Sequence, residues 1–337
     1  MSVLYLHTTP PPHLEGTDAV HQEVDLLIQR FEGQVINLFP FQHPLSLPGQ
    51  YLHSLRSIIR ILRAEKRTQI NHIFSPVLSY YAVFHLMKNP LIYSVIANVG
   101  AEPPKRLAQM RRFQRIIVSN ERDRDQLTDW GFTNHLMVRT GLDLSTFSYG
   151  PFPLSDQITL LMASAPWVRD QFESKGINLL LRAAARLPNL RLIFLWRGLL
   201  LEDLQRMVKH YQVSDRVEII NEKVDVNNIL ARVHGSILLA RHGGIVKAYP
   251  HSLLESLAAG KPVILSQTIP MSDYVSNQEC GVVVKDYNLD SVIQSISELM
   301  SKYRTLTSNT QPGLGGKFSK DQMLNNLAGI YQSILNG

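Results

Sequence analysis

Short apolar runs separated by helical patterns extend along the whole chain. Runs rich in Val, Ile and Phe occupy residues 3–7, 34–39, 71–76, 91–96, 115–120 and 135–140 of the first half. The second half carries such runs at residues 157–164, 190–196, 216–221, 235–240, 261–266 and 281–286. Continuous apolar strands that alternate with helices are typical of a parallel sheet covered on both faces. The sequence therefore predicts an α/β fold with two Rossmann-like domains.

The predicted boundary between the two domains lies at residues 148–156. Two prolines and a glycine interrupt the periodicity there, and Gln157 starts a new strand. A second polar stretch, residues 305–316, precedes a last helix from about Ser319 to Leu335. We therefore expect an N-terminal domain over residues 1–150, a C-terminal domain over residues 151–318, and a separate C-terminal helix over residues 319–337.

The composition is that of an ordinary globular protein, with 45% hydrophobic and 18% charged residues, which excludes a disordered or collagen-like chain. The single cysteine, Cys280, cannot form a disulfide within the chain, and this favours a reducing compartment. The first residues lack the basic segment of a signal peptide, and no window holds ~20 consecutive apolar residues. We expect a cytoplasmic protein without a membrane span.

The net charge of +6 is concentrated in one segment. Residues 54–115 hold eleven lysines and arginines against Glu65 and Glu102, a balance of +9, whereas the rest of the chain carries −3. Apolar residues recur there at helical spacing, at Leu52, Leu55, Ile58, Ile59 and Leu62. Arginines follow on another face of the same predicted helix, at Arg56, Arg60, Arg63 and Arg67.

A second basic cluster is expected to share a helix with Leu107 and Met110. It comprises Lys105, Arg106, Arg111, Arg112 and Arg115. An anionic membrane surface attracts such residues by about 1 kcal/mol each, which would place the protein at the inner face of a membrane. The alternative is a solvated helix face without a partner. Because the charge belongs to one patch and not to the whole chain, we expect no nucleic-acid partner.

The segment that most clearly indicates a binding site spans residues 241–264. A predicted strand ends there, a loop with glycines turns, and a helix begins near Ser252. Free N–H groups and the helix dipole hold anions at a helix start, so residues 250–253 are expected to bind a diphosphate. We place Glu255 in the first turn, from where its carboxylate can accept hydrogen bonds from two vicinal hydroxyls of a ribose.

This window resembles the GT-B glycosyltransferases of family 4, the retaining group 1 transferases. Their pattern is a glutamate, seven residues, a second glutamate, a helix of small residues, and Gly-Lys/Thr-Pro-Val. Residues 254–264 match its second half, and residues 118–147, 175–181 and 187–198 resemble other family segments in the family's order. The resemblance covers about two thirds of the chain. It implies a GT-B fold with a cleft between two lobes, and a last helix that crosses back onto the first domain.

The resemblance also implies site residues. Lys175 matches the lysine on the donor diphosphate, with Arg169 as a neighbouring cation, and Glu255 would hold the ribose. The other residues expected at the donor are Ser252, Leu253, Leu254, His242, Gly243, Gly244, Glu222, Lys223 and Val224, the last three beside the nucleotide base. Gly16 and Thr17 match the family's glycine loop at the sugar and acceptor site; an ordinary strand-to-helix turn is the alternative.

Two positions depart from the family pattern. Lys247 stands where the first glutamate of the pair contacts the transferred sugar, and a lysine there can bind a hydroxyl or the carboxylate of an acidic sugar. The family's first-domain histidine is replaced by Ala97 or Asn98. Retaining transfer mainly requires positioning and stabilisation of the leaving diphosphate, so we expect Lys247, Lys175 and Arg169 to serve catalysis.

We therefore expect a metal-independent, retaining hexosyltransferase without a cofactor. Its donor would be a nucleoside-diphosphate sugar, with UDP favoured by family frequency, and its acceptor a glycan or a lipid-linked glycan. The alternative is a nucleotide-sugar-binding or scaffold protein on the same fold whose catalytic site has decayed. A dinucleotide-dependent oxidoreductase is disfavoured because no glycine fingerprint follows any predicted strand.

Overall fold

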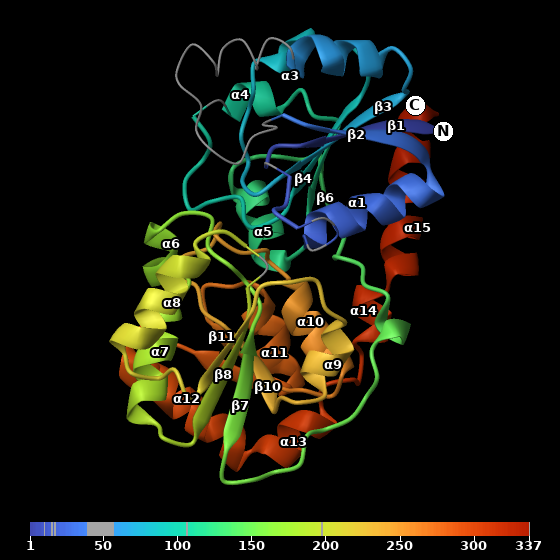
Figure 1. Ribbon diagram of the computed structural model, residues 1–337. Helices are drawn as coiled ribbons and strands as arrows, with labels where there is room; N and C mark the ends of the chain where they lie inside the picture. The colour runs from blue at the N-terminus through green and yellow to red at the C-terminus, as the bar shows by residue number, and fades with distance from the viewer. Residues whose placement is uncertain are drawn as a thin grey trace. The chain divides into compact units, whose positions relative to one another are not determined.

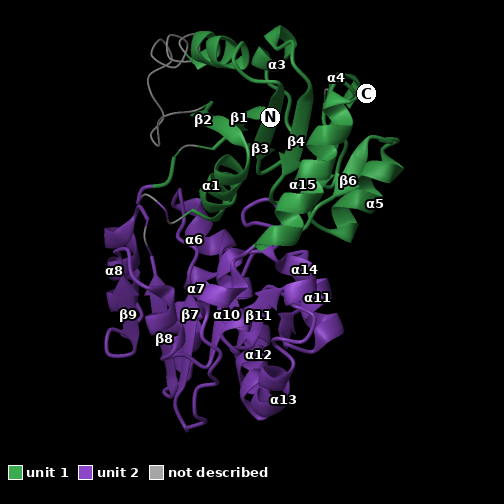
Figure 2. Cartoon of the chain, turned by 90° about the vertical axis from the view of Figure 1, so that its right-hand side faces the viewer, with its two compact units in different colours: residues 1–12, 18–141, 320–337 green, residues 13–17, 142–319 purple. Residues whose placement is uncertain are grey.

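The computed structural model describes residues 1–9, 11–14, 16, 18–38, 57–105, 107–196 and 198–336. These residues form two six-stranded sheets of parallel strands, and each sheet lies in its own compact unit (Figure 2). The first unit comprises residues 1–12, 18–141 and 320–337, and the second comprises residues 13–17 and 142–319. The predicted α/β fold with two Rossmann-like sheets is confirmed.

In the first unit the strand order is β2-β1-β3-β4-β5-β6 (Figure 1). The strands are β1 (Ser2–His7), β2 (Glu32–Asn37), β3 (Ile70–Ser75), β4 (Leu91–Val95), β5 (Arg115–Val118) and β6 (His135–Met137). The helices are α1 (Ala19–Arg30), α3 (Val83–Leu86), α4 (Leu107–Met110), α5 (Glu121–Asp129) and α15 (Lys320–Leu335), and residues 57–65 are also helical. Every residue of the central strand β3 is buried, because both faces of the sheet are covered.

In the second unit the strand order is β12-β11-β10-β7-β8-β9. The strands are β7 (Ile158–Met162), β8 (Leu190–Leu195), β9 (Val217–Ile220), β10 (Gly235–Leu238), β11 (Val263–Ser266) and β12 (Gly281–Val284). The helices are α6 (Asp170–Ser174), α7 (Ile177–Arg186), α8 (Leu201–His210), α9 (Val226–Leu230), α10 (His251–Ala258), α11 (Met271–Gln278), α12 (Leu289–Ser301), α13 (Tyr303–Ser308) and α14 (Gly315–Phe318). A single turn of 3-10 helix, η1 (Leu144–Thr146), precedes β7.

The last helix, α15, belongs to the first unit although it follows the second unit in the sequence. Its buried residues Leu327 and Tyr331 pack in one core with Val3 and Tyr5 of β1. The Tyr331 hydroxyl lies 2.6 Å from Nδ1 of His72, and Oγ of Ser94 lies 2.8 Å from Nε2 of the same ring. Both ring nitrogens of a fully buried histidine are thus hydrogen-bonded, and one of the partners comes from α15.

The start of α15 explains the glycine at position 141. A Cβ atom on Gly141 would lie 2.9 Å from Cα of Lys320 and 2.7 Å from Cβ of Met323. Real side chains do not approach so closely, so only glycine leaves room for this helix start. The residue after Gly141 belongs to the second unit. There the N–H of Leu142 donates to the carbonyl oxygen of Phe318 at 2.8 Å.

All twelve predicted strands are present, but the polar stretch 305–316 holds more structure than its composition suggests. Helix α13 extends into it as far as Ser308, and α14 begins at Gly315. The reason is the burial of isolated apolar residues, Leu306 and Leu314, in the core of the second unit. Among the described residues, no helix is both long enough and apolar enough to cross a membrane.

The basic helix of the first unit exists, and its predicted apolar residues Ile58 and Leu62 pack against the core, but Ile59 does not. Ile61 and Ala64 are buried, whereas Ile59 is 44% exposed. The carboxylate of buried Glu65 sets this orientation, because its Oε1 accepts the N–H of Lys88 at 2.7 Å and the N–H of Asn89 at 2.9 Å. Leu52, Leu55 and Arg56 lie outside the described residues.

The second basic cluster does not share one helix. Helix α4 ends at Met110, so Arg111 and Arg112 follow it and Arg115 begins β5. The guanidinium of Arg112 donates instead to the carbonyl oxygens of His85 and Met87, near the end of α3. Arg106 lies outside the described residues.

A group of histidines lies in the core of the first unit. His7 is 0% exposed and stacks on His21, with ring centroids 4.2 Å apart. Within the described residues, neither ring nitrogen of His7 has a hydrogen-bond partner. Burial, and then the neighbouring charge of His21, lowers the pKa of His7 to about 3; burial, and then His7, lowers the pKa of His72 to about 3.

These two histidines should make the first unit sensitive to acid. Their folded-state pKa values lie below the ordinary value of 6.5, so the unfolded chain binds more protons between pH 6.5 and 3. Stability is therefore complete above pH 6.5 and falls as the pH decreases, by at most ~1.4 kcal/mol per pH unit for each histidine. His7→Phe should reduce this slope by roughly half in urea unfolding at pH 7, 6, 5 and 4. His85→Phe, which changes an exposed histidine, should keep the wild-type slope; equal slopes in all three proteins would contradict the assignment.

Candidate functional site

The order of the strands locates a candidate site in the second unit. The chain runs from β7 outward to β8 and β9 on one side, then returns to build β10, β11 and β12 on the other side. In sheets of this type, ligands bind at the carboxyl ends of the two strands where the direction of building reverses. In this sheet those strands are β7 and β10, which are direct neighbours.

Lys175 lies at this point. It is the C-cap residue of α6, in the segment that follows β7, and it is 3% exposed. Its Nζ donates to the carbonyl oxygen of Ala165 at 2.9 Å and to Oγ of Ser164 at 3.2 Å. Burial lowers the pKa of Lys175 to about 8, so its ammonium is still mostly charged at neutral pH.

The next residue holds this lysine in place. Gly176 has φ of +70°, and a Cβ atom there would lie 2.6 Å from Cβ of Leu239, just after β10. Both the left-handed backbone and the close approach to Leu239 require glycine. The Lys-Gly pair of the sequence pattern therefore brings the end of α6 against the end of β10.

Polar contacts join the loops at this edge of the sheet. The N–H of Arg241 donates to the carbonyl oxygen of Ser174 at 2.8 Å, and its guanidinium pairs with Glu173 at 2.7 Å. The Tyr287 hydroxyl, after β12, donates to the carbonyl oxygen of Glu173 at 2.6 Å. Loops from β7, β10 and β12 are thus tied together around the position of Lys175.

Helix α10 begins at His251, one residue before the predicted start, and this changes the position of Glu255. Glu255 is the fifth residue of the helix, so it lies in the second turn and not in the first. Its side chain is half-buried. The side chains of Leu253 and Leu254 are buried in the core, so only their backbone could reach a ligand.

The predicted anion site at residues 250–253 is smaller than expected. The N–H groups of Leu253 and Leu254 already donate to the carbonyl oxygen of Pro250, at 3.1 and 3.2 Å, and proline has no N–H. The N–H of Ser252 donates to no acceptor within the described part of the chain. Nζ of Lys247 lies 3.4 Å from Nε2 of His251, so two basic side chains meet at the start of this helix.

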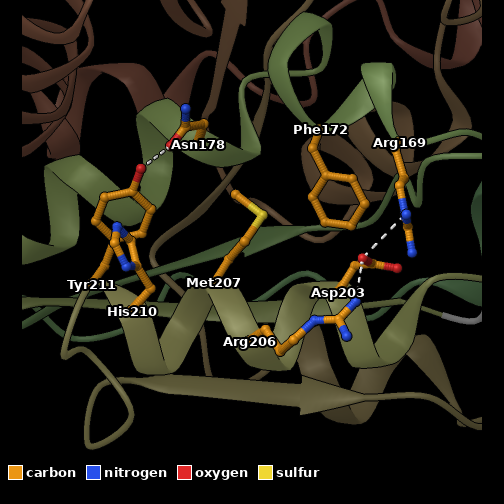
Figure 3. Close-up of a pocket in the computed structure, with 8 residues that line it drawn as sticks. All are labelled: Arg169, Phe172, Asn178, Asp203, Arg206, Met207, His210 and Tyr211. Atoms are coloured by element: carbon orange, nitrogen blue, oxygen red, sulfur yellow. Dashed lines mark hydrogen bonds and ion pairs between the residues drawn. The ribbon is translucent and has the colours of Figure 1, made fainter.

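Arg169 does not join Lys175 in one clamp. Figure 3 shows it at a pocket with Phe172 of α6 and Met207 of α8, and its Nε lies 3.3 Å from Oδ1 of Asp203. Asp203 also pairs with Arg206, at 2.6 Å. The extra residues before Lys175 form helix α6, and this helix carries Arg169 toward α8.

The remaining predicted residues lie in loops. Nδ1 of His242 lies 2.8 Å from the carbonyl oxygen of Gly243, a local contact of an exposed histidine, and Gly244 has φ of +89°. Glu222 and Lys223 are exposed and Val224 is half-buried, in the loop between β9 and α9. Gly16 has φ of +73° in the loop before α1, and Thr17 lies outside the described residues.

Sequence reasoning missed two residues at this site. Ser164 contacts the ammonium of Lys175, and Arg241 ties two loops together. The position of Ser164 directly after a predicted strand was a signal that could have found it. Among the described residues, no group of three or more His, Cys, Asp or Glu side chains could hold a metal ion.

The comparisons with known proteins relate this chain to glycosyltransferases. Residues 167–311 match the model of a protein family described as "Glycosyl transferases group 1". A curated relative, the lipopolysaccharide core biosynthesis glycosyltransferase LpsE of Rhizobium meliloti (strain 1021), is 25% identical over 67% of this chain. That match covers 66% of the relative, so the chain spans just under two thirds of its length.

Two solved structures share the fold along nearly their whole length. HepE of Anabaena, in complex with UDP-glucose, gives a TM-score of 0.75 at 12% identity and covers 99% of this chain and 100% of its own. Sucrose-phosphate synthase of Thermosynechococcus elongatus gives 0.74 at 14% identity and covers 100% of both chains. At such low identity, these likenesses establish the two-sheet fold.

The buried ammonium of Lys175 should bind a diphosphate anion. Lys175→Met should weaken the binding of inorganic pyrophosphate by about tenfold or more at pH 7, measured by calorimetry. In the wild type, affinity should fall as the pH rises past about 8, because the ammonium then loses its proton. Lys302→Met, at an exposed lysine after α12, should bind like the wild type. Unchanged affinity in Lys175→Met would exclude a role of this lysine.

Proposed function

Because the chain has the GT-B fold and carries a group 1 glycosyl transferase domain, we propose that it transfers a sugar from a nucleoside-diphosphate sugar to a glycan acceptor with retention of configuration. The observation that carries this proposal is the buried ammonium of Lys175 at the carboxyl ends of β7 and β10. A cation held there neutralises charge on a leaving diphosphate, and this is the main requirement of such a transfer.

The roles of the second unit follow from this position. Lys175 and the start of α10 bind the diphosphate, Glu255 accepts hydrogen bonds from the ribose, and residues 222–224 lie beside the base. UDP is the nucleotide we propose, because UDP and UDP-glucose are the ligands named for the similar structure HepE. The transfer needs no metal ion in this proposal, because Lys175 supplies the positive charge at the diphosphate.

Glu255 provides the test of the donor site. We expect micromolar binding of UDP in calorimetry, and weaker binding of GDP, ADP and CMP. EDTA should not change the affinity. Glu255→Ala should lower the affinity for UDP by about 100-fold, because two hydrogen bonds to a charged acceptor are lost. Glu202→Ala, which changes an exposed glutamate of α8, is the control. Full affinity in Glu255→Ala would refute the ribose assignment, and no binding of any nucleotide would refute the donor site.

A substitution at Lys247 distinguishes an active transferase from a protein that has lost its catalytic activity. We propose that the Lys247 ammonium binds the transferred sugar, either at a hydroxyl or at the carboxylate of an acidic sugar. Lys247→Glu should then reduce transfer by about tenfold or more, with a larger loss for UDP-glucuronate than for UDP-glucose. A rise in transfer would instead support the second candidate function, a nucleotide-sugar-binding protein whose catalytic glutamate has been lost.

The acceptor and the location of the protein are proposed from the first unit. The curated relative is named as a glycosyltransferase of lipopolysaccharide core biosynthesis. The helical residues 57–65 expose Arg60 and Arg63, and Lys66 and Arg67 follow directly. Two apolar side chains of the basic segment 54–115 are also exposed: Ile59 at 44% in this helix, and Leu86 at 53% at the end of α3. We therefore propose a lipid-linked acceptor and a peripheral contact of this basic segment with an anionic membrane.

Liposome flotation tests the membrane contact. The protein should float with vesicles that contain anionic lipid and stay unbound with neutral vesicles. The double variant Arg60→Glu and Arg63→Glu should lower the affinity at least tenfold, because each basic residue contributes about 1 kcal/mol at such a surface. The control reverses two exposed arginines of the second unit, Arg182→Glu and Arg191→Glu. If flotation does not depend on anionic lipid, the basic segment is a solvated surface.

A further inference from the structure

The loops that follow β7, β8 and β9 are joined at the carboxyl edge of the second unit's sheet. Strand β8 lies between β7 and β9, and β9 is the outermost strand on that side (Figure 2). A Cβ atom on Gly198, in the loop after β8, would lie 2.6 Å from Cβ of Ala165, in the loop after β7. The N–H of Gly198 donates to Oδ1 of Asn221, which directly follows β9, at 3.2 Å. Contacts therefore lead from the loop after β7 to Asn221.

These contacts begin at the cation of the proposed donor site. The carbonyl oxygen of Ala165 accepts the ammonium of Lys175 at 2.9 Å. Neighbouring strands of a sheet lie about 4.8 Å apart, so β9 lies roughly 10 Å from β7. In the proposed function the diphosphate lies at Lys175 and the base lies beside residues 222–224, which follow Asn221 in the sequence. Asn221 is therefore placed at the base end of the donor.

The side-chain amide of Asn221 has a fixed orientation. A backbone N–H requires an acceptor, so the oxygen Oδ1 faces Gly198 and the amino group Nδ2 lies on the other side of the amide. The side chain is half-buried, and Nδ2 is accessible to solvent and has no hydrogen-bond partner within the described residues. Asn221 thus offers N–H donors, and not an acceptor, to a ligand.

The loop that orients this amide is itself held in place. Nε1 of Trp196 donates to the carbonyl oxygen of Leu199 at 2.6 Å. The next residue, Leu200, has φ of +60°, a left-handed conformation that leucine rarely adopts. Such a conformation persists only where the surrounding structure holds it. Gly198 lies between Trp196 and Leu199, so a ligand would meet an amide that is already oriented.

An N–H donor distinguishes pyrimidine bases by the group at position 4 of the ring. Uracil carries an oxygen there, which accepts a hydrogen bond, whereas cytosine carries an amino group, which donates one. A donor that faces the cytosine amino group leaves two polar groups without a partner. Position 4 lies on the side of the ring away from the ribose, and β9 is the strand on this side that lies farthest from Lys175. This edge of the base is therefore the one that reaches Asn221.

We propose that Asn221 selects the base of the donor. Its amino group donates to the oxygen at position 4 of uracil and disfavours cytosine, which presents an amino group at the same place. The inference rests on the proposed function, because it assumes that a nucleotide-sugar lies along the carboxyl edge. It assigns the preference for UDP to one side chain, which lies outside residues 222–224.

UDP and CDP test this proposal, because they differ only at positions 3 and 4 of the ring. In calorimetry of the full chain at pH 7, the wild type should bind UDP about tenfold or more tightly than CDP. Asn221→Asp keeps the shape of the side chain and an oxygen toward Gly198, but it replaces the amino group by an acceptor. This variant should lower the ratio of the CDP to the UDP dissociation constant about tenfold or more. The added negative charge weakens both nucleotides, so the ratio is the quantity to compare.

Two further variants complete the test. Asn221→Ala removes the amino group without adding a charge, and it should lower the ratio toward one. Asn228→Asp places the same added charge at an exposed asparagine of α9, and it should keep the wild-type ratio. If Asn221→Asp does not fold, Asn221→Ala decides.

The outcomes separate this inference from the proposed function. Equal binding of UDP and CDP by the wild type would overturn the role of Asn221, and so would an unchanged ratio in the Asn221 variants. In both cases the binding of UDP would still support the donor site. If the wild type binds neither nucleotide, the donor site itself is refuted, and the selection of its base with it.

Discussion

The architecture depends on one constraint, the burial of both faces of each parallel sheet. Strands β3 and β10 are buried at every residue, so their faces are closed to a ligand, and a polar side chain such as His72 is bonded within the core. Groups that bind a ligand must therefore lie at the ends of the strands. In the second unit the carboxyl edge holds Lys175 and the loops tied to it, and the amino edge holds the buried Lys261. Both positions follow from what the sheet excludes from its faces.

The two buried lysines of the second unit, Lys175 and Lys261, differ in the contacts of their ammonium groups. Burial lowers the pKa of both side chains to about 8. The ammonium of Lys175 nevertheless donates to a carbonyl oxygen and a hydroxyl, which replace part of its hydration. The ammonium of Lys261 has only the face of an aromatic ring among the described residues. Lys175 is thus held by two hydrogen bonds, whereas the Lys261 ammonium has no hydrogen-bond partner within the described residues.

The strands and the Lys-Gly pair could be predicted from the sequence, because each depends on local pattern. Apolar runs identify the strands, and the family pattern identifies Lys175 and Glu255. Side-chain direction could not be predicted in the same way. Arg169 turns toward Asp203 because residues 170–174 form α6, and Glu255 falls in the second turn because α10 begins at His251. Ile59 is exposed because Glu65 binds backbone N–H groups more than twenty residues away in the sequence, a contact that no periodicity records.

The position of α15 has a consequence for how the chain is made. The core around β1 needs Leu327 and Tyr331, and His72 needs the Tyr331 hydroxyl. The ribosome synthesises these residues after the second unit, whereas it synthesises β1 before that unit. The second unit, residues 142–319, emerges in full before α15 does. The first unit is thus begun before the second unit and completed after it, and its histidine core stays open until α15 has been synthesised.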